Sequence, residues 1–237
     1  MTDLLDLVAR EPDAVLRYGA APQQIVDRYA ARSPGRGPVV LVHGGFWRAR
    51  WDRIHLRPLA AALADRGYDV LLPEYRRIGD PGGGWPGTGA DVVALVAALP
   101  ALVGAAPRTT LVSHSAGGHL ALWSQAAHPS PHVETVVALA GVADLRAAAD
   151  LRLSDDAVLE LLGDHPLAPA DPLQLPTPPM PVTLVHGADD SDVPPALGRA
   201  YAARHPRARL IELAGTDHFD LVDPRTPAFD TLLTLLP

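Results

Sequence analysis

Residues 110–120 read TLVSHSAGGHL, an apolar run that leads into Ser115 and continues through small residues into a second apolar run. The first run predicts a buried strand at Thr109–His114, and the second predicts a helix at 116–128. A strand, a sharp turn that carries a serine and a helix form the nucleophile elbow, in which the serine has a strained backbone. The stretch therefore predicts Ser115 as a catalytic nucleophile.

This turn is so tight that the residues two before and two after the serine must be small. Here they are Ser113 and Gly117, so the steric requirement is met although glycine is more usual at the first position. The helix that begins at Ala116 directs its N-terminal N–H groups and the positive end of its dipole toward the reacting centre. The alternative is that Ser115 only caps this helix, because serine is a good N-cap.

The rest of the chain alternates short apolar runs with longer amphipathic ones. This alternation predicts an α/β protein with a mostly parallel central sheet and helices on both faces. A further stretch at 23–30 would add an antiparallel edge strand. The other strands are expected at 38–43, 69–74, 109–114, 135–140, 182–186 and 209–213. The helices are expected at about 52–66, 88–103, 116–128, 195–205 and 226–236.

Two segments fall outside this alternation. Residues 80–87 form a Gly/Pro loop that contains Trp85, and residues 144–180 hold many prolines and one short helical pattern at about 155–162. A long insertion after the carboxyl end of a strand overhangs the ligand crevice of an open α/β sheet. We therefore expect a small cap inserted into a single domain of residues 1–237. The alternative is a surface excursion that touches no ligand.

The sequence HGGFW at 43–47 follows the strand at 38–43. Acyl transfer needs two donors aimed at the developing oxyanion. In an elbow of this kind one donor is the amide after the nucleophile, that of Ala116, and a loop such as 43–47 supplies the second, from either Gly45 or Phe46. His43 is expected to shape the turn. The residues expected to contact the substrate or wall its pocket are Gly44, Phe46, Trp47, Trp85 and His114.

The catalytic acid and base should follow the nucleophile in that order along the chain. The strand at 182–186 runs into an acidic loop with three aspartates, of which Asp190 has the usual register of the acid. Asp189 is the second candidate, and Asp192 best suits a helix N-cap. His218 follows both the acid and the last strand, so it can take the Ser115 proton while Asp190 fixes its tautomer.

Four histidines, His43, His114, His119 and His186, could cluster around a metal. The sequence offers no HExxH motif and no comparable i, i+4 pair with a carboxylate. We therefore expect neither a metal nor a cofactor.

Composition narrows the classes of partner. The 237 residues carry a formal net charge of −7 and are 48% hydrophobic, as expected of a soluble domain and not of a nucleic-acid binder. The sequence contains no uninterrupted apolar run of about 18 residues, so it predicts no membrane span. The acidic start at 1–13 does not resemble a signal peptide, so we expect a cytoplasmic protein.

Lys, Asn and Cys are absent, which excludes a thiol nucleophile and a Lys base. The sequence leaves a homodimer open.

The motifs HGGFW, SHSAGGHLA, HGADDSD and DHF resemble those of α/β-hydrolases in the group of kynurenine formamidases and related carboxylesterases. The resemblance extends over nearly the whole chain, including Tyr18-Gly19 and the stretches 27–29 and 74–77. It implies the α/β-hydrolase fold and a small ester or aryl formamide as substrate. The residues that it assigns are the triad Ser115, Asp190 and His218, and the oxyanion turn Gly44, Gly45 and Phe46.

The leading hypothesis is a serine hydrolase that acts on a small ester or aryl formamide through an acyl-enzyme. A serine peptidase or amidase on the same fold is the nearest alternative, although such peptidases usually carry a large extra domain for which this chain has no room. A non-catalytic binding protein is the alternative from another class. Such proteins have usually lost a member of the triad, and all three members are present here.

Overall fold

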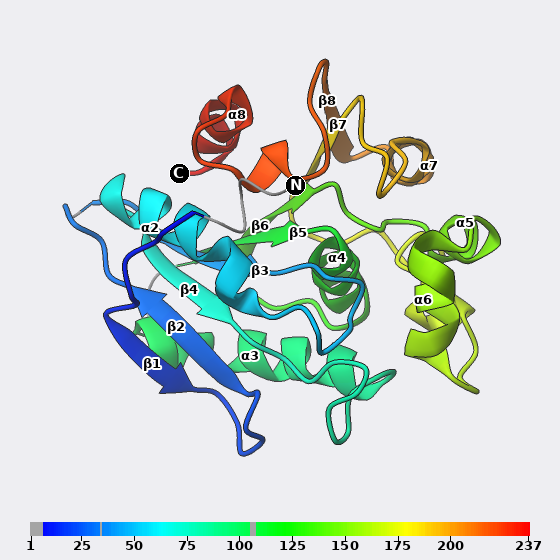
Figure 1. The fold of residues 1–237 in the computed structure, drawn as a ribbon, viewed down its shortest axis with the longest axis horizontal. Coiled ribbons are helices and arrows are strands. Elements are labelled where there is room, and N and C mark those ends of the chain that lie inside the picture. The colour runs from blue at the N-terminus through cyan, green and yellow to red at the C-terminus, as the bar shows by residue number, and fades with distance from the viewer. Residues whose placement is uncertain (1–6, 34, 105–107) are drawn as a thin grey trace.

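The computed structural model describes residues 7–33, 35–104 and 108–237, so Met1–Asp6 of the acidic N-terminal stretch lie outside the described residues. In the described residues eight strands form one sheet, in the order β1-β2-β4-β3-β5-β6-β7-β8 (Figure 1). The strands β3 to β8 run parallel, and β1 and β2 are antiparallel to their neighbours. The strands are β1 Ala14–Arg17, β2 Ile25–Tyr29, β3 Pro38–Val42, β4 Asp69–Pro73, β5 Thr109–His114, β6 Val133–Leu139, β7 Val182–Gly187 and β8 Ala208–Leu213.

Helices cover both faces of this sheet because the strands are apolar on both sides. In β3, Val39 and Leu41 pack with α2 and α8, whereas Val40 and Val42 pack with α3 and α4 on the opposite face. Figure 1 shows α2 and α8 on the side of the sheet away from α3. The helices and 3-10 turns are η1 Arg53–Leu56, α2 Arg57–Asp65, α3 Gly87–Val103, α4 Ala116–Ala127, α5 Leu145–Asp150, α6 Leu153–Leu162, η2 Ala168–Ala170, α7 Ala196–Arg204, η3 Asp220–Val222 and α8 Pro227–Leu235.

The predicted α/β architecture is confirmed, with three corrections. The stretch predicted at 23–30 is an antiparallel strand, β2, but it is not the edge, because the four-residue β1 pairs with its outer side. The helix predicted at 52–66 begins as a 3-10 turn, and α2 then starts at Arg57 with Pro58 in its first turn. The segment 144–180 holds two α-helices, α5 and α6, where one was predicted.

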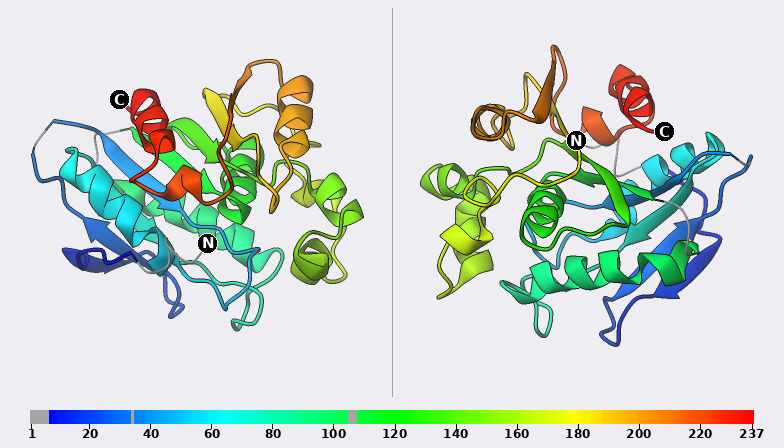
Figure 2. Two further views of the ribbon diagram at one scale, coloured as in Figure 1. Left: turned by 45° about the horizontal axis from the view of Figure 1, so that its top comes forward. Right: turned by 180° about the vertical axis from the view of Figure 1, so that it is seen from behind.

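Parallel strands bring their carboxyl ends to one edge of the sheet, and the predicted site residues follow four of those ends. The loop at 43–51 follows β3, Ser115 follows β5, Asp190 follows β7 and His218 follows β8. The strands β3 and β5 are direct neighbours, with Val42 paired to Ser113. Both views of Figure 2 show the yellow-green α5 and α6 at the periphery, outside the sheet.

Candidate active site

Ser115 occupies the strained turn between β5 and α4. Its φ of 55° and ψ of −122° lie where non-glycine residues are uncommon. Hydrogen bonds hold this conformation: its N–H donates to the Leu139 carbonyl at 2.9 Å, and its carbonyl accepts from Gly118 at 2.8 Å and from Val142 at 3.2 Å. The side chain reaches the cavity described below although the residue is only 2% exposed.

The residues that flank the elbow are small for a steric reason. A Cβ on Gly117 would lie 2.4 Å from the backbone oxygens of both Val42 and His43, so this position admits only glycine. Ser113 is buried in β5, and its hydroxyl donates to the Val137 carbonyl at 3.3 Å. A serine therefore fits where glycine is more usual, because its one polar atom has a partner.

Of the three candidate aspartates, Asp190 is the one that hydrogen-bonds to His218. The Nδ1 atom of His218 lies 2.8 Å from Oδ2 of Asp190. The other oxygen, Oδ1, accepts from the amides of Asp192 at 3.0 Å and Val193 at 2.8 Å, which fix the carboxylate plane. Asp189 is exposed, and the exposed Asp192 lines the cavity.

The surroundings of Asp190 keep it ionised. Burial raises its pKa, but the nearby His186 ring and the hydrogen bond with His218 lower it by more, so the pKa lies well below its ordinary value. An ionised Asp190 holds the proton of His218 on Nδ1. The Nε2 atom is then the free base on the cavity side.

His114, the residue before the nucleophile, holds the loop that carries His218. Its Nε2–H donates to the backbone carbonyl of His218 at 3.0 Å, and the two rings lie 4.6 Å apart. Burial lowers the pKa of His114 well below its ordinary value, so the ring is neutral. The sequence predicts His114 only as a substrate contact. It does line the cavity, but its link to His218 emerges only in three dimensions.

The candidate oxyanion donors are the amides of Ala116, Gly45 and Phe46, none of which has an acceptor among the described residues. The loop is strained, with positive φ at Gly45 (100°), Phe46 (47°) and Trp47 (58°). Because the N–H and C=O of a trans peptide point in opposite directions, the bond that His43 makes to the Gly44 carbonyl turns the Gly45 N–H away from His43. The Gly45 carbonyl is bonded in turn by the Arg48 N–H at 3.1 Å, so both peptides are fixed, and Gly45 and Phe46 both stay candidates for the second donor.

Two acceptors hold the His43 ring below this loop. Its Nδ1 lies 2.8 Å from the Gly44 carbonyl and its Nε2 lies 2.8 Å from Oε1 of Glu74, so both ring nitrogens face acceptors. Tyr75 stacks on the ring at 4.4 Å and donates to the His43 carbonyl at 2.8 Å. Burial raises the pKa of Glu74, but His43 and Arg77 outweigh it and lower the pKa to about 2. The expectation that His43 shapes the turn matches these contacts.

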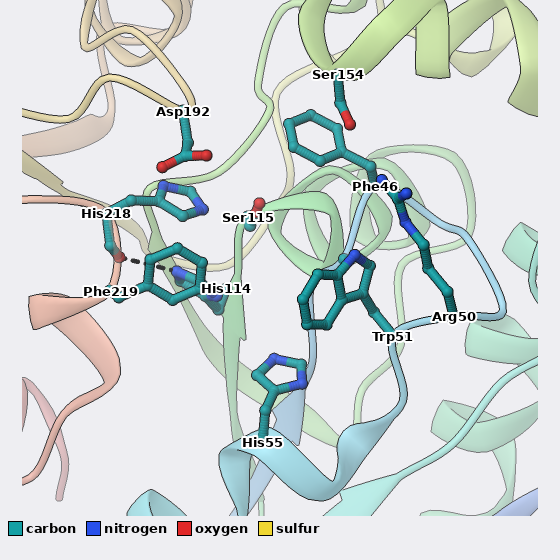
Figure 3. A pocket seen from close by; sticks show the side chains of 11 residues that line it. Phe46, Arg50, Trp51, His55, His114, Ser115, Ser154, Asp192, His218 and Phe219 are labelled. Carbon is teal, nitrogen blue, oxygen red and sulfur yellow. Dashed lines mark hydrogen bonds between the residues drawn. The ribbon is translucent and has the colours of Figure 1, made fainter. Parts of the chain in front are cut away.

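Ser115 and His218 open onto a cavity of about 160 Å³ (Figure 3). Its walls are mainly aromatic, and several of its residues were not predicted from the sequence. Trp51 and His55 lie shortly after the HGGFW motif and Phe219 follows His218, so adjacency to these motifs was the available signal. The lining residues are Gly45, Phe46, Arg50, Trp51, His55, His114, Ser115, Ser154, Asp192, His218 and Phe219.

Three residues predicted to contact the substrate are placed elsewhere. Trp47 is fully buried and meets His119 edge to face at 5.2 Å, so it anchors the loop to α4 instead of walling the pocket. Trp85 packs against Trp123 at 4.6 Å. Gly44 lies beneath the nucleophile, where a Cβ would come within 2.7 Å of the Ser115 Cβ. It leaves room for the serine and does not line the cavity.

The segment 144–180 reaches the cavity through Ser154 at the start of α6. Arg48, in the loop after β3, ties this start down by donating to Ser154 Oγ at 3.1 Å, the Asp155 carbonyl at 3.1 Å and Glu160 at 2.6 Å. The proposed cap therefore contacts the oxyanion loop directly.

The histidines considered as metal ligands have other partners. His119 donates to the Ala170 carbonyl at 2.8 Å and His186 to the Val193 carbonyl at 2.8 Å. Within the described residues no group of three or more His, Cys, Asp or Glu side chains is placed to hold a metal ion. Across the same residues, no helix has the length and apolar composition of a membrane span.

No family model and no curated protein matches the sequence of this chain, whereas solved structures match its fold. Esterase B from Lactobacillus rhamnosis superposes with a TM-score of 0.78 at 24% identity, covering 96% of this chain and 86% of the esterase. A carbohydrate esterase from gut microbiota gives 0.76 at 16%, covering 95% and 98%. The thermophilic esterase Est2 from Thermogutta terrifontis gives 0.73 at 21%, covering 94% and 89%.

These likenesses, together with the sheet order and the elbow, show that the chain has the α/β-hydrolase fold. Two of the similar proteins have also been solved with phosphorus reagents. Esterase B has a structure inhibited by a tributyrin phosphonate, and Est2 has one phosphoramylated by tabun.

Proposed function

We propose that the protein is a serine hydrolase that cleaves a small carboxylic ester or aryl formamide through an acyl-enzyme. The observation that carries the proposal is the juxtaposition of a strained Ser115 with the Asp190–His218 hydrogen bond, at one cavity at the carboxyl edge of the sheet. The esterases that share the fold support the ester class.

In this mechanism Ser115 Oγ attacks the substrate carbonyl carbon while Nε2 of His218 takes its proton. The carbonyl π electrons move to oxygen, and the amide of Ala116, together with that of Gly45 or Phe46, stabilises the resulting oxyanion. The intermediate then breaks its C–O or C–N bond, and His218 returns the proton to the leaving group. Water, deprotonated by the same His218, hydrolyses the acyl-enzyme and regenerates Ser115.

Among the described residues, no hydrogen bond joins Ser115 to His218. Catalytic hydrogen bonds are often long without substrate and tighten in the Michaelis complex. A rotation of the Ser115 side chain toward Nε2 accompanies substrate binding in this mechanism.

Cavity size supports a small substrate. A cavity of about 160 Å³ is close to that of an engineered protein cavity that holds one benzene molecule. A short acyl chain or one aromatic ring fits such a space, and the aromatic walls favour a ring. The formyl group of an aryl formamide is the smallest acyl group, which keeps this substrate beside simple esters.

The proposal is tested with Ser115→Ala. We expect loss of p-nitrophenyl acetate turnover with an unchanged circular dichroism spectrum, and a fluorophosphonate probe should label the parent protein and not the variant. Undiminished turnover would rule out the mechanism. A folded parent protein that resists labelling would favour a binding protein. Comparing N-formylkynurenine with short and long p-nitrophenyl esters separates formamides from esters.

A further inference from the structure

His55 presents a ring nitrogen to the cavity. It lies on η1, Arg53–Leu56, and its ring points up from the cavity floor toward Ser115 and Trp51 (Figure 3). Its Nδ1 lies 2.5 Å from the backbone carbonyl of Asp52. A carbonyl can only accept, so the ring proton sits on Nδ1 and Nε2 carries a lone pair.

No described residue donates to Nε2 of His55. Nε2 of His55 does not carry a proton either. Burial and the neighbouring charge of His43 lower the pKa of His55 to about 4, so the ring is neutral near pH 7. His43 meets it edge to face at 5.8 Å and keeps the ring in place. The cavity therefore contains a fixed, neutral hydrogen-bond acceptor.

The surroundings of this acceptor are aromatic. Trp51, Phe46 and Phe219 provide flat apolar faces on the same cavity. Trp51 and His55 also line an adjoining surface pocket with Arg50 and Ile54, so a ring bound between the aromatic walls can carry a substituent past His55. A ligand that excluded water from Nε2 and offered no donor would leave this atom without a hydrogen bond, which costs binding free energy.

We infer that Nε2 of His55 accepts a hydrogen bond from a phenolic O–H or aryl N–H of the substrate. The preferred substrates are then small aromatic esters or amides that carry a donor on the ring. This inference rests on the proposed hydrolase function, and it makes His55 a specificity-determining residue rather than part of the proton relay.

The test compares 3-hydroxyphenyl acetate with 3-methoxyphenyl acetate and phenyl acetate, and methyl 3-hydroxybenzoate with methyl benzoate. The two series place the donor on the leaving group and on the acyl group. We expect the hydroxylated ester of at least one series to be favoured about 3- to 10-fold in kcat/KM by the parent protein. His55→Phe should abolish this preference, and His55→Gln, whose Oε1 also accepts, should retain part of it. Differences in intrinsic ester reactivity cancel because each ratio is compared across variants.

His128→Phe, an exposed histidine at the end of α4, is the matched control and should keep the parental ratio. Fluorophosphonate titration counts the competent sites of each variant, and His55→Leu replaces His55→Phe if the latter does not fold. Parental ester hydrolysis without a hydroxyl preference, or a preference that survives in His55→Phe, overturns the inference. Absence of any ester or amide hydrolysis overturns the proposed function instead.

Discussion

Asp190 illustrates how a single residue is selected within an acidic loop. Three aspartates stand within four positions, yet Asp190 is the one whose carboxylate meets His218, while two backbone amides orient its other oxygen. Chain order and register, which are sequence properties, predict this residue. The hydrogen bonds that make it an orienting carboxylate depend on β7 and β8 being neighbours.

Replacing Asp190 by Asn should lower kcat by about 10³- to 10⁴-fold, because an amide favours the wrong tautomer of His218. Steady-state kinetics with p-nitrophenyl acetate measures the loss. Asp189→Asn is the matched control, since the Asp189 side chain is exposed and its backbone N–H still donates to Thr216 at 3.1 Å. Equal losses in both variants would argue against Asp190 as the acid.

His114 should act on catalysis through the position of His218. His114→Phe removes the donor to the His218 carbonyl while retaining a ring of similar shape. We expect kcat to fall about 10-fold with little change in KM, since the base moves and the cavity keeps its size. His114→Gln, which retains a donor, should recover part of the rate. An unchanged kcat in a folded Phe variant would leave His114 with a packing role only.

At the scale of elements, the strands and helices that bury an apolar face are predicted well from periodicity, whereas those that depend on tertiary contacts are not. The strand β5 and helix α4 lie within one residue of their predicted bounds. The edge strand β1 is four mostly exposed residues with no alternation, and it exists because β2 pairs with it. Trp47 reads as a pocket residue beside the glycines, but the positive φ values of the loop accompany its burial against α4.

The start of α6 is a second element that its neighbours hold in place. Arg152 and residues 154–156 have φ between 50° and 60°, a region unfavourable for non-glycine residues. Arg48 binds three groups here from the oxyanion loop, which couples the proposed cap to the site. Without this clamp, the strained turn is expected to relax and carry Ser154 away from the cavity.

Arg48→Met should therefore raise KM for aromatic esters more than it lowers kcat, and should reduce the free energy of unfolding by about 1–2 kcal/mol. Urea denaturation and steady-state kinetics measure the two effects. Arg199→Met removes an exposed ion pair with Glu212 and should change stability by less than about 0.5 kcal/mol. If the two variants are indistinguishable, Arg48 does not clamp α6.

At the scale of the whole molecule, the site is assembled from segments that only the sheet brings together. The nucleophile, acid and base come from β5, β7 and β8, and the oxyanion loop from β3. Parallel pairing with right-handed crossovers makes this convergence predictable. The size of the cavity and the acceptor on His55 depend on side-chain packing between these segments, so sequence patterns carry no signal for them.

Burying so many titratable groups should make the folded state sensitive to acid. Burial lowers the pKa of His55 and of His119 to about 4, and the pKa of Glu74 is lowered to about 2. Between pH 6.5 and 4 these histidines bind protons in the unfolded chain but not in the folded chain. The free energy of unfolding therefore falls as the pH drops from 6.5 to 4. Glu74 stabilises the fold above pH 4.5, and its contribution is lost between pH 4.5 and 2.

We expect the free energy of unfolding to decline continuously from neutral pH to pH 3, steepest where these windows overlap. His119→Gln can still donate to the Ala170 carbonyl but does not titrate. It should reduce the slope between pH 6 and 4.5 by about 1.4 kcal/mol per pH unit, the value for one proton. Urea unfolding followed by tryptophan fluorescence at each pH measures this slope. His128→Gln, at an exposed position, should leave it unchanged, and equal slopes in the parent protein and His119→Gln would show that His119 is not held neutral by burial.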